Sequence, residues 1–173
     1  MKRLAVVVFV VVAVAATYRS FGSAETGTGT LTLPQPAPNV GATAPPFTVQ
    51  TVGGRRFVLS DEGIYVLTFW SSLNLGSNEA RPGFVELARE YEDDGVSFAA
   101  VYVNSPPRGG DAPYTTLQDS TGKLTSLYNV KRVPRIFLVQ DGTIEFVHDG
   151  YYEGIEKDLE EALKSALKKE KKS

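Results

Sequence analysis

The sequence predicts an α/β sandwich built around a mixed β-sheet. An almost continuous apolar, β-rich run at 64–70 is followed by a segment with helical periodicity, and a second β-rich run follows at 96–103. This order of strand, helix and strand is typical of a parallel crossover. A predicted hairpin and a closing amphipathic helix complete the pattern.

The strands are predicted from short runs of β-forming residues. Residues 47–51 and 56–59 flank Gly53-Gly54, which indicates two strands joined by a tight turn. The run 64–70 is apolar at nearly every position, as expected for a strand that is covered on both faces. Further strands are expected at 96–103, 136–139 and 143–147, the last two joined across Asp141-Gly142.

Two amphipathic helices are predicted from apolar residues three and four positions apart. The first occupies 78–94 and ends at Gly95. The second occupies 156–169, and the lysines that follow its apolar stripe complement the helix dipole. The apolar positions are Phe84, Leu87, Ala88 and Tyr91 in the first helix, and Ile155, Leu159, Ala162, Leu163, Ala166 and Leu167 in the second.

Composition excludes several classes of chemistry. The 173 residues include 18 Lys plus Arg and 20 Asp plus Glu, a formal net charge of -2, which gives no general attraction to nucleic acid. The chain has no cysteine and a single histidine, His148. It therefore has no thiolate, disulfide or cysteine-ligated metal, and no site with several histidine ligands. We expect no metal, no cofactor and no nucleic-acid partner.

The N-terminus resembles an export signal. Met1-Lys2-Arg3 precedes the uncharged apolar run 4–16, the order found in secretory signals. Ala13-Val14-Ala15 fits a small-x-small cleavage site, whereas Tyr18-Arg19 suits the interfacial end of an uncleaved anchor. Both alternatives place the protein in the cell envelope, on the periplasmic or extracytoplasmic side, and the second tethers it to the cytoplasmic membrane. The expected organisation is a signal or anchor at 1–19, a flexible Gly/Thr/Pro linker at 20–39, a folded domain at 40–169 and a basic tail at 170–173.

Four spaced blocks carry a family pattern. They read V-G-A-x-A-P-x-F at 40–47, G-G-x-x-F-x-L-S-D at 53–61, V-L-T-F-W-S-S at 66–72 and V-P-x-x-F-L-V-x-D-G at 133–142. Together they resemble the membrane-tethered thioredoxins of the TlpA and ResA type, over roughly 40–167. The resemblance implies a thioredoxin-like three-layer sandwich with a mixed central β-sheet and an N-terminal β-hairpin.

The resemblance also locates a site whose chemistry has been lost. In that family the strand ending in Phe-Trp leads into C-x-x-C at a helix N-terminus, followed by x-x-E-x-P. Here Asn74 and Ser77 occupy the two cysteine positions, Ala80 the glutamate position, and Pro82 is retained. Neither Asn74 nor Ser77 forms or exchanges a disulfide, so no catalytic residue is predicted. Ser77 is not expected to be a nucleophile, because the one candidate base, His148, is predicted on a distant strand.

A second departure lies between Val103 and Tyr114, where the family usually has a crossover helix. The segment N-S-P-P-R-G-G-D contains two prolines and two glycines, which do not form a helix of normal length. We therefore expect a loop here, with a face of the core that is left open to a partner.

A peptide-binding groove is the part of the family site that needs no sulfur. The resemblance implies a cis bond at Val133-Pro134 and pairing of the Val133 backbone with an extended segment as an added strand. Arg132 and Arg135 flank this bond and offer donors to an acidic segment, unless they are ordinary surface charges. The predicted binding residues are Asn74, Ser77, Arg132, Val133, Pro134 and Arg135.

Three functional hypotheses follow. The first is a redox-inactive thioredoxin-like domain of the cell envelope that binds a protein or extended peptide as a scaffold, assembly factor or chaperone-like module. The second, by family similarity only, is a thiol-disulfide oxidoreductase or peroxiredoxin-like enzyme, which the absence of cysteine argues against. The third is a structural subunit of an envelope complex.

Overall fold

The structure, a computed structural model, describes residues 38–108 and 112–170. The predicted signal or anchor at 1–19 lies outside the described residues, as do almost all of the predicted linker and basic tail. Within the two described ranges, no helix combines the length and apolar character needed to cross a membrane.

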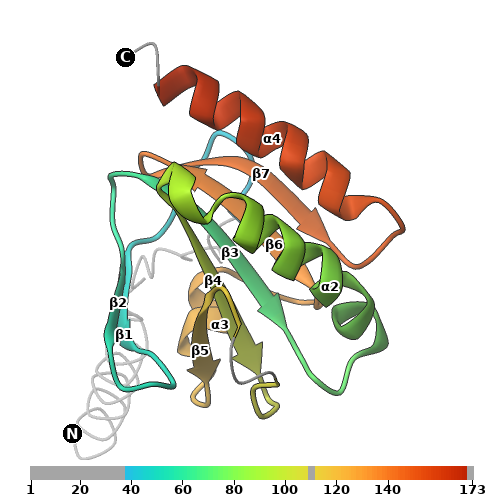
Figure 1. Ribbon diagram of the computed structural model, residues 1–173. Coiled ribbons are helices and arrows are strands. Elements are labelled where there is room, and N and C mark those ends of the chain that lie inside the picture. The colour runs from blue at the N-terminus through green and yellow to red at the C-terminus, as the bar shows by residue number, and fades with distance from the viewer. Residues whose placement is uncertain (1–37, 109–111, 171–173) are drawn as a thin grey trace, which may run out of the picture. The chain divides into compact units, whose positions relative to one another are not determined.

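A five-stranded mixed sheet has the strand order β5-β4-β3-β6-β7 (Figure 1). β3 runs parallel to β4, and β4 runs parallel to β5, whereas β6 is antiparallel to both β3 and β7. The central strands β3 and β6 are buried along nearly their whole length, as their apolar sequences predict. The strand bounds are β3 (Ile64–Trp70), β4 (Val96–Val103), β5 (Thr115–Asp119), β6 (Arg135–Gln140) and β7 (Thr143–Asp149).

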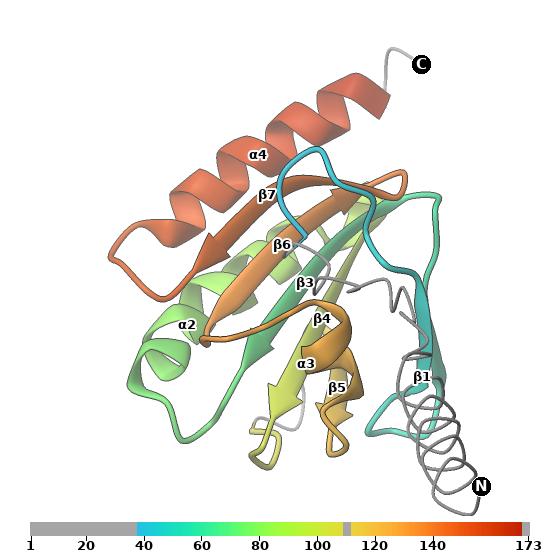
Figure 2. The same cartoon turned by 180° about the vertical axis from the view of Figure 1, so that it is seen from behind.

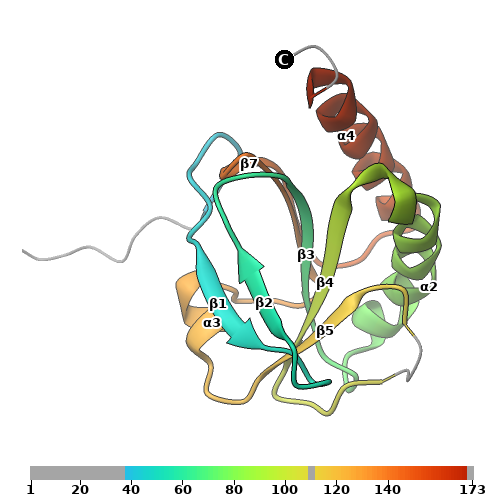
Figure 3. The same ribbon diagram turned by 60° about the vertical axis from the view of Figure 1, so that its left-hand side comes forward.

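Helices cover both faces of the sheet. Figure 3 shows α2 and α4 on one side and, on the other, α3 with a separate two-stranded hairpin, while Figure 2 shows that second face from the front. The described domain is therefore a three-layer sandwich with an N-terminal hairpin, and this predicted architecture is confirmed. The bounds are β1 (Phe47–Gln50), β2 (Arg56–Leu59), α2 (Leu75–Glu90), α3 (Lys123–Leu127), α4 (Ile155–Glu170) and the short 3-10 helix η1 (Glu92–Asp94).

Alternation along the strands divides the core into two clusters. On β3, Val66 and Trp70 face α2 and α4, whereas Leu67 and Phe69 face α3 and the hairpin. The second cluster is centred on Tyr128, whose hydroxyl donates a 2.8 Å hydrogen bond to the carbonyl of Pro45. This bond joins the segment after α3 to the entry of the N-terminal hairpin.

Most element boundaries agree with the sequence-based expectations, with four differences. α2 begins at Leu75 rather than at 78, because Asn74 caps it. β5 and α3 were not predicted at all: β5 has polar residues at four of its five positions, and α3 has only five residues. α2 also ends at Glu90 rather than at 94, and the separate 3-10 helix η1 follows it; Gly95, with a left-handed φ of 77°, ends η1 and not α2.

The connection between β4 and β5 contains no helix in its described residues, 104–108 and 112–114. Tyr114 packs from this connection against Trp70 and Phe84, with ring centroids 6.1 and 5.3 Å away. Tyr114 is itself 8% exposed. The expected loop is therefore confirmed for these residues, and Tyr114 covers part of the face that was expected to be open.

Candidate functional site

The two residues at the family's cysteine positions bind each other at the start of α2. Asn74 is the N-cap, and its Oδ1 accepts hydrogen bonds from the Ser77 backbone N–H at 2.8 Å and from the Ser77 hydroxyl at 3.1 Å. The Ser77 Oγ in turn accepts a bond from the N–H of Ser71 at 3.3 Å. Asparagine is among the best N-cap residues, so this substitution keeps the helix start stable without sulfur.

Within residues 38–108 and 112–170, no acid or base forms a hydrogen bond with Ser77. Its side chain is buried, at 3% exposure, and its proton is directed to the Asn74 amide oxygen, which is not a base. His148 lies on β7, where its ring packs edge-to-face on Tyr152 with centroids 4.8 Å apart. Ser77 lies in the first turn of α2, as expected.

Three segments meet at the first turn of α2. The Val133–Pro134 bond is cis, as the resemblance implies. A Cβ built on Gly76 would lie 3.5 Å from Pro134 Cδ and 3.0 Å from Tyr151 Cβ, in the connection between β7 and α4. Glycine at 76 therefore permits the close approach of both segments. We name this region the cis-proline face and define it by Asn74, Val133 and Pro134, with Leu73, Leu75, Arg132 and Tyr151 around them.

Arg135 does not belong to this face, and the expectation that it offers donors to a bound acidic segment is wrong. It is 5% exposed on β6, and Nη1 donates two hydrogen bonds to the Asp149 carboxylate on β7, directly across the strand pair. Its guanidinium also lies 5.0 Å from the ring centroid of Phe137. Arg135 is thus a buried structural residue whose charge is neutralised within the sheet.

Arg132 is exposed, as predicted, and its Cδ lies 3.8 Å from the position of a Cβ on Gly150. Among the other predicted residues, Asn74 and Val133 are partly exposed, while Ser77 and Pro134 are buried. Ser77 therefore supports the surface from below without contributing to it.

An exposed apolar rim was missed by the sequence analysis. Leu73 and Leu75, on either side of Asn74, are 76% and 72% exposed, the two highest values among the large hydrophobic residues of the described chain. Tyr151, which packs on Gly76, is 37% exposed. The available signal was the pair of leucines at a strand-to-helix junction, outside the buried stripe of α2.

The backbone of Val133 is free to pair. No hydrogen bond of the described residues uses its N–H or its carbonyl, whereas the next carbonyl, that of Pro134, accepts a 2.7 Å bond from the Gly150 N–H. An unpaired, partly exposed amide unit beside an apolar surface is what strand addition requires.

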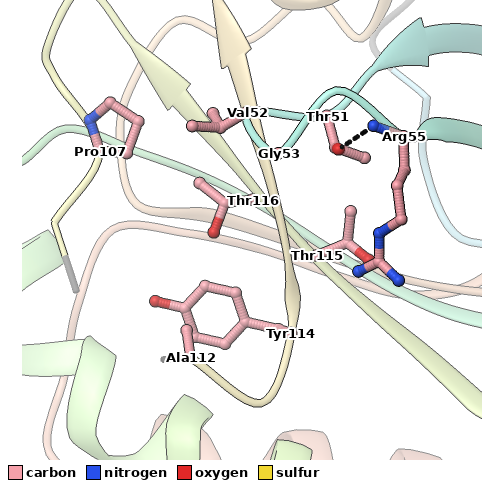
Figure 4. Close-up of a pocket in the computed structure, with 9 residues that line it drawn as sticks. All are labelled: Thr51, Val52, Gly53, Arg55, Pro107, Ala112, Tyr114, Thr115 and Thr116. Carbon is pink, nitrogen blue, oxygen red and sulfur yellow. Dashed lines mark hydrogen bonds between the residues drawn. The ribbon is translucent and has the colours of Figure 1, made fainter. Parts of the chain in front are cut away.

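A cavity lies away from the cis-proline face, between the hairpin turn and the start of β5 (Figure 4). It has a volume of about 540 Å³. Arg55 is the one charged residue among the described residues of its lining, and its backbone N–H donates to Thr51 Oγ1. None of the described residues that line it is a carboxylate or an imidazole. Its walls are Thr51, Val52, Gly53, Arg55, Pro107, Ala112, Tyr114, Thr115 and Thr116.

The described residues offer no metal centre: no group of three or more His, Cys, Asp or Glu within 38–108 and 112–170 is placed to hold an ion. The position of the family's acid, Ala80, is 7% exposed on the inner side of α2. The centre therefore lacks both thiols and the carboxyl group that accompanies them in the resemblance.

Solved structures share this thioredoxin-like fold. A protein of Chlorobium tepidum described as a thiol:disulfide interchange protein, DsbE, is 25% identical, with a TM-score of 0.65, and the match covers 75% of this chain and 98% of that one. StoA from Bacillus subtilis is 21% identical, with a TM-score of 0.58 and coverage of 70% and 98%. A secreted Mycobacterium tuberculosis disulfide oxidoreductase is 18% identical, with a TM-score of 0.55 and coverage of 69% and 95%.

No curated protein matches the sequence of the chain. The family model described as AhpC/TSA family matches residues 40–147, which include both hairpin strands, the start of α2 and the cis-proline bond. Because this match spans most of the folded domain, the chain belongs to the AhpC/TSA family, as a member without cysteine.

Proposed function

We propose that this protein is a redox-inactive thioredoxin-like domain that binds an extended polypeptide along its cis-proline face. The observation that carries the proposal is the free N–H and carbonyl of Val133. A bound segment adds a short strand there through main-chain hydrogen bonds, which depend on shape rather than on a reactive side chain. Binding is reversible, because Asn74 and Ser77 form no mixed disulfide.

The exposed leucines supply the apolar contact. Leu73 and Leu75 present most of their side-chain surface to solvent on either side of Asn74, and Tyr151 borders the same first turn of α2. Burial of apolar surface stabilises an association by roughly 25 cal/mol per Å². We infer that the bound segment places an apolar side chain against these residues.

Arg132 supplies the charge preference. It is exposed and, unlike Arg135, takes part in none of the ion pairs within residues 38–108 and 112–170. A carboxylate on the bound segment near Arg132 gains a charge-assisted hydrogen bond. The preferred ligand is therefore an extended segment that combines an apolar residue with an acidic one.

The N-terminal sequence supports an envelope location for this binding. Lys2, Arg3 and the apolar run 4–16 favour export, so the partner is an envelope polypeptide and the role is that of a scaffold, assembly factor or chaperone-like module. Fractionation with an alkaline membrane wash, followed by N-terminal sequencing, separates a tethered chain from a cleaved one. A cytoplasmic main pool with an intact N-terminus contradicts this part of the proposal.

Peptide selection tests the binding itself. A random library of extended peptides is selected on the immobilised protein, and hydrogen exchange is then measured with the best peptide. We expect slower exchange of the Val133 amide in the complex. The double variant Leu73→Ser/Leu75→Ser should weaken binding at least tenfold, a loss of about 1.4 kcal/mol or more. Val52→Ser is the matched control, since Val52 is 55% exposed on the hairpin turn. Equal affinities for both variants would exclude the cis-proline face.

A further inference from the structure

The side-chain amide of Asn74 is held in one orientation. Its oxygen, Oδ1, accepts the 2.8 Å hydrogen bond from the Ser77 backbone N–H. A backbone N–H only donates, so a flipped amide would set its own N–H groups against this donor. The helix cap therefore fixes Oδ1 toward Ser77, and the amide nitrogen Nδ2, with its two N–H groups, is directed to the other side of the side chain.

Nδ2 has no acceptor among the described residues. No hydrogen bond within 38–108 and 112–170 uses this atom, and Asn74 is partly exposed, so the nitrogen is open to a ligand. The other polar groups of Asn74 are engaged. Its backbone N–H donates to the Ser71 carbonyl, its carbonyl accepts from the Asn78 N–H, and Oδ1 accepts two bonds from Ser77. Asn74 thus offers a ligand donors and no free acceptor.

This donor belongs to the same small region as the cis-proline bond. A Cβ built on Gly76 would lie 3.5 Å from Asn74 Oδ1, 3.5 Å from Pro134 Cδ and 3.0 Å from Tyr151 Cβ. The amide, the proline ring and the tyrosine therefore gather around one point. Val133, whose main-chain groups are free, directly precedes this proline. A segment that pairs with Val133 has side chains within reach of the Asn74 amide.

We propose that Asn74 is a specificity-determining residue, which selects a bound segment with an oxygen-acceptor side chain at the position that faces Nδ2. The inference rests on the proposed function and adds to it the chemical class of one ligand residue: aspartate, asparagine, glutamate or glutamine. Their carboxylate or amide oxygen accepts from Nδ2, whereas lysine and arginine side chains have no acceptor. A thiol sulfur is only a weak acceptor, so cysteine is not preferred.

The isosteric change Asn74→Asp separates this role from the helix cap. Aspartate is as good an N-cap as asparagine, and its charge suits a helix N-terminus, so the urea midpoint should stay the same or rise. One carboxylate oxygen still accepts from Ser77, but the other now presents an acceptor where the natural chain presents a donor. The best peptide selected on the natural chain should bind this variant about tenfold or more weakly. A new selection on the variant should enrich lysine or arginine at the position concerned.

Two further variants complete the comparison. Asn74→Ser keeps a capping oxygen without a free amide, so selection on it should enrich neither class of side chain. Gln118→Glu makes the same amide-to-carboxylate change at an exposed position of β5 and should keep the residue profile of the natural chain.

The outcomes distinguish this inference from the proposed function. Peptides that slow exchange of the Val133 amide, but show the same residue profile with Asn74→Asp as with the natural chain, overturn the selectivity of Asn74 alone. A selection that yields no binder, or binders that leave the Val133 amide unprotected, overturns both proposals.

Discussion

Asn74 Oδ1 accepts hydrogen bonds from the backbone N–H and from the hydroxyl of Ser77, at 2.8 and 3.1 Å. These are the positions that hold the dithiol in the family pattern that this chain resembles. A hydrogen-bonded cap thus stands where a disulfide would form, and it satisfies a backbone donor at the start of α2. The chain retains the scaffold of a thioredoxin site without the atoms for its redox reaction.

The cap should contribute measurably to stability. Asn74→Ala removes both acceptor contacts to Ser77 and should lower the free energy of unfolding by about 1 kcal/mol, within the 0.5–2 kcal/mol typical of lost N-caps. Urea unfolding measures this, with Glu79→Ala, an exposed position on the same helix, as the control. An Asn74→Ala protein as stable as the control would mean that the cap is not what holds this helix start.

Restoring the cysteines should restore little activity. Asn74→Cys/Ser77→Cys reintroduces the dithiol, but Ala80 leaves the position of the tuning acid without a carboxyl group. We expect no insulin reduction, dithiol oxidation or peroxidase turnover by the natural chain, and weak insulin reduction at most by the double variant. Adding Ala80→Glu should raise the rate, because a carboxyl group at this buried position exchanges protons with the inner thiol. High activity of the double variant alone would show that the acid is dispensable.

Arg135 should matter for stability, whereas Arg132 should matter for peptide binding. Asp149→Asn removes the carboxylate that neutralises buried Arg135 and should lower the free energy of unfolding by about 1–3 kcal/mol, nearer the lower value because the Asp149 side chain is 45% exposed. Arg132→Gln should leave stability within about 0.5 kcal/mol and weaken acidic peptides. Chemical denaturation and peptide titration of both variants test this division. A stability loss for Arg132→Gln alone contradicts it.

Tyr128 should make the fold sensitive to alkali. Burial raises the pKa of this phenol above its usual value of 10. Above about pH 10 the unfolded chain loses the proton first, so the free energy of unfolding falls as the pH rises, while below pH 10 this group adds no pH dependence.

Tyr128→Phe should therefore flatten the alkaline loss, and at neutral pH it should cost about 1 kcal/mol through the lost bond to the Pro45 carbonyl. Urea unfolding between neutral pH and about pH 11 measures both effects. Tyr151→Phe, at an exposed position, is the control, and an equal alkaline loss in both variants would assign the effect to other groups.

The fold was largely predictable because local sequence patterns indicate its central strands and turns. The run at β3 is apolar on both faces, and Asp141-Gly142 marks the β6–β7 turn, so both were predicted. β5 was not, because its stability comes from pairing with β4 and not from its own polar sequence.

The site was predictable in part. Matching the family's C-x-x-C and cis-proline motifs to this sequence predicted that Asn74, Ser77 and Pro134 lie near one helix start. The structure brings their segments together. Arg135 was misplaced because its burial depends on the register that sets Asp149 opposite it, a partner 14 residues away in the sequence. The exposure of Leu73 and Leu75 was not predicted, because apolar residues at such a junction are usually buried.

Site-specific photo-crosslinking in the cells that produce the protein tests the central claim most directly. A photoreactive residue is placed at Leu75 on the cis-proline face, and in separate proteins at Val52 on the hairpin turn and at Lys164 on α4. The account predicts an adduct with an envelope polypeptide at Leu75, lost when Arg132→Glu is added, and no matching adduct at the two control positions. Adducts at Val52 or Lys164 with none at Leu75 would contradict it and place the functional surface elsewhere.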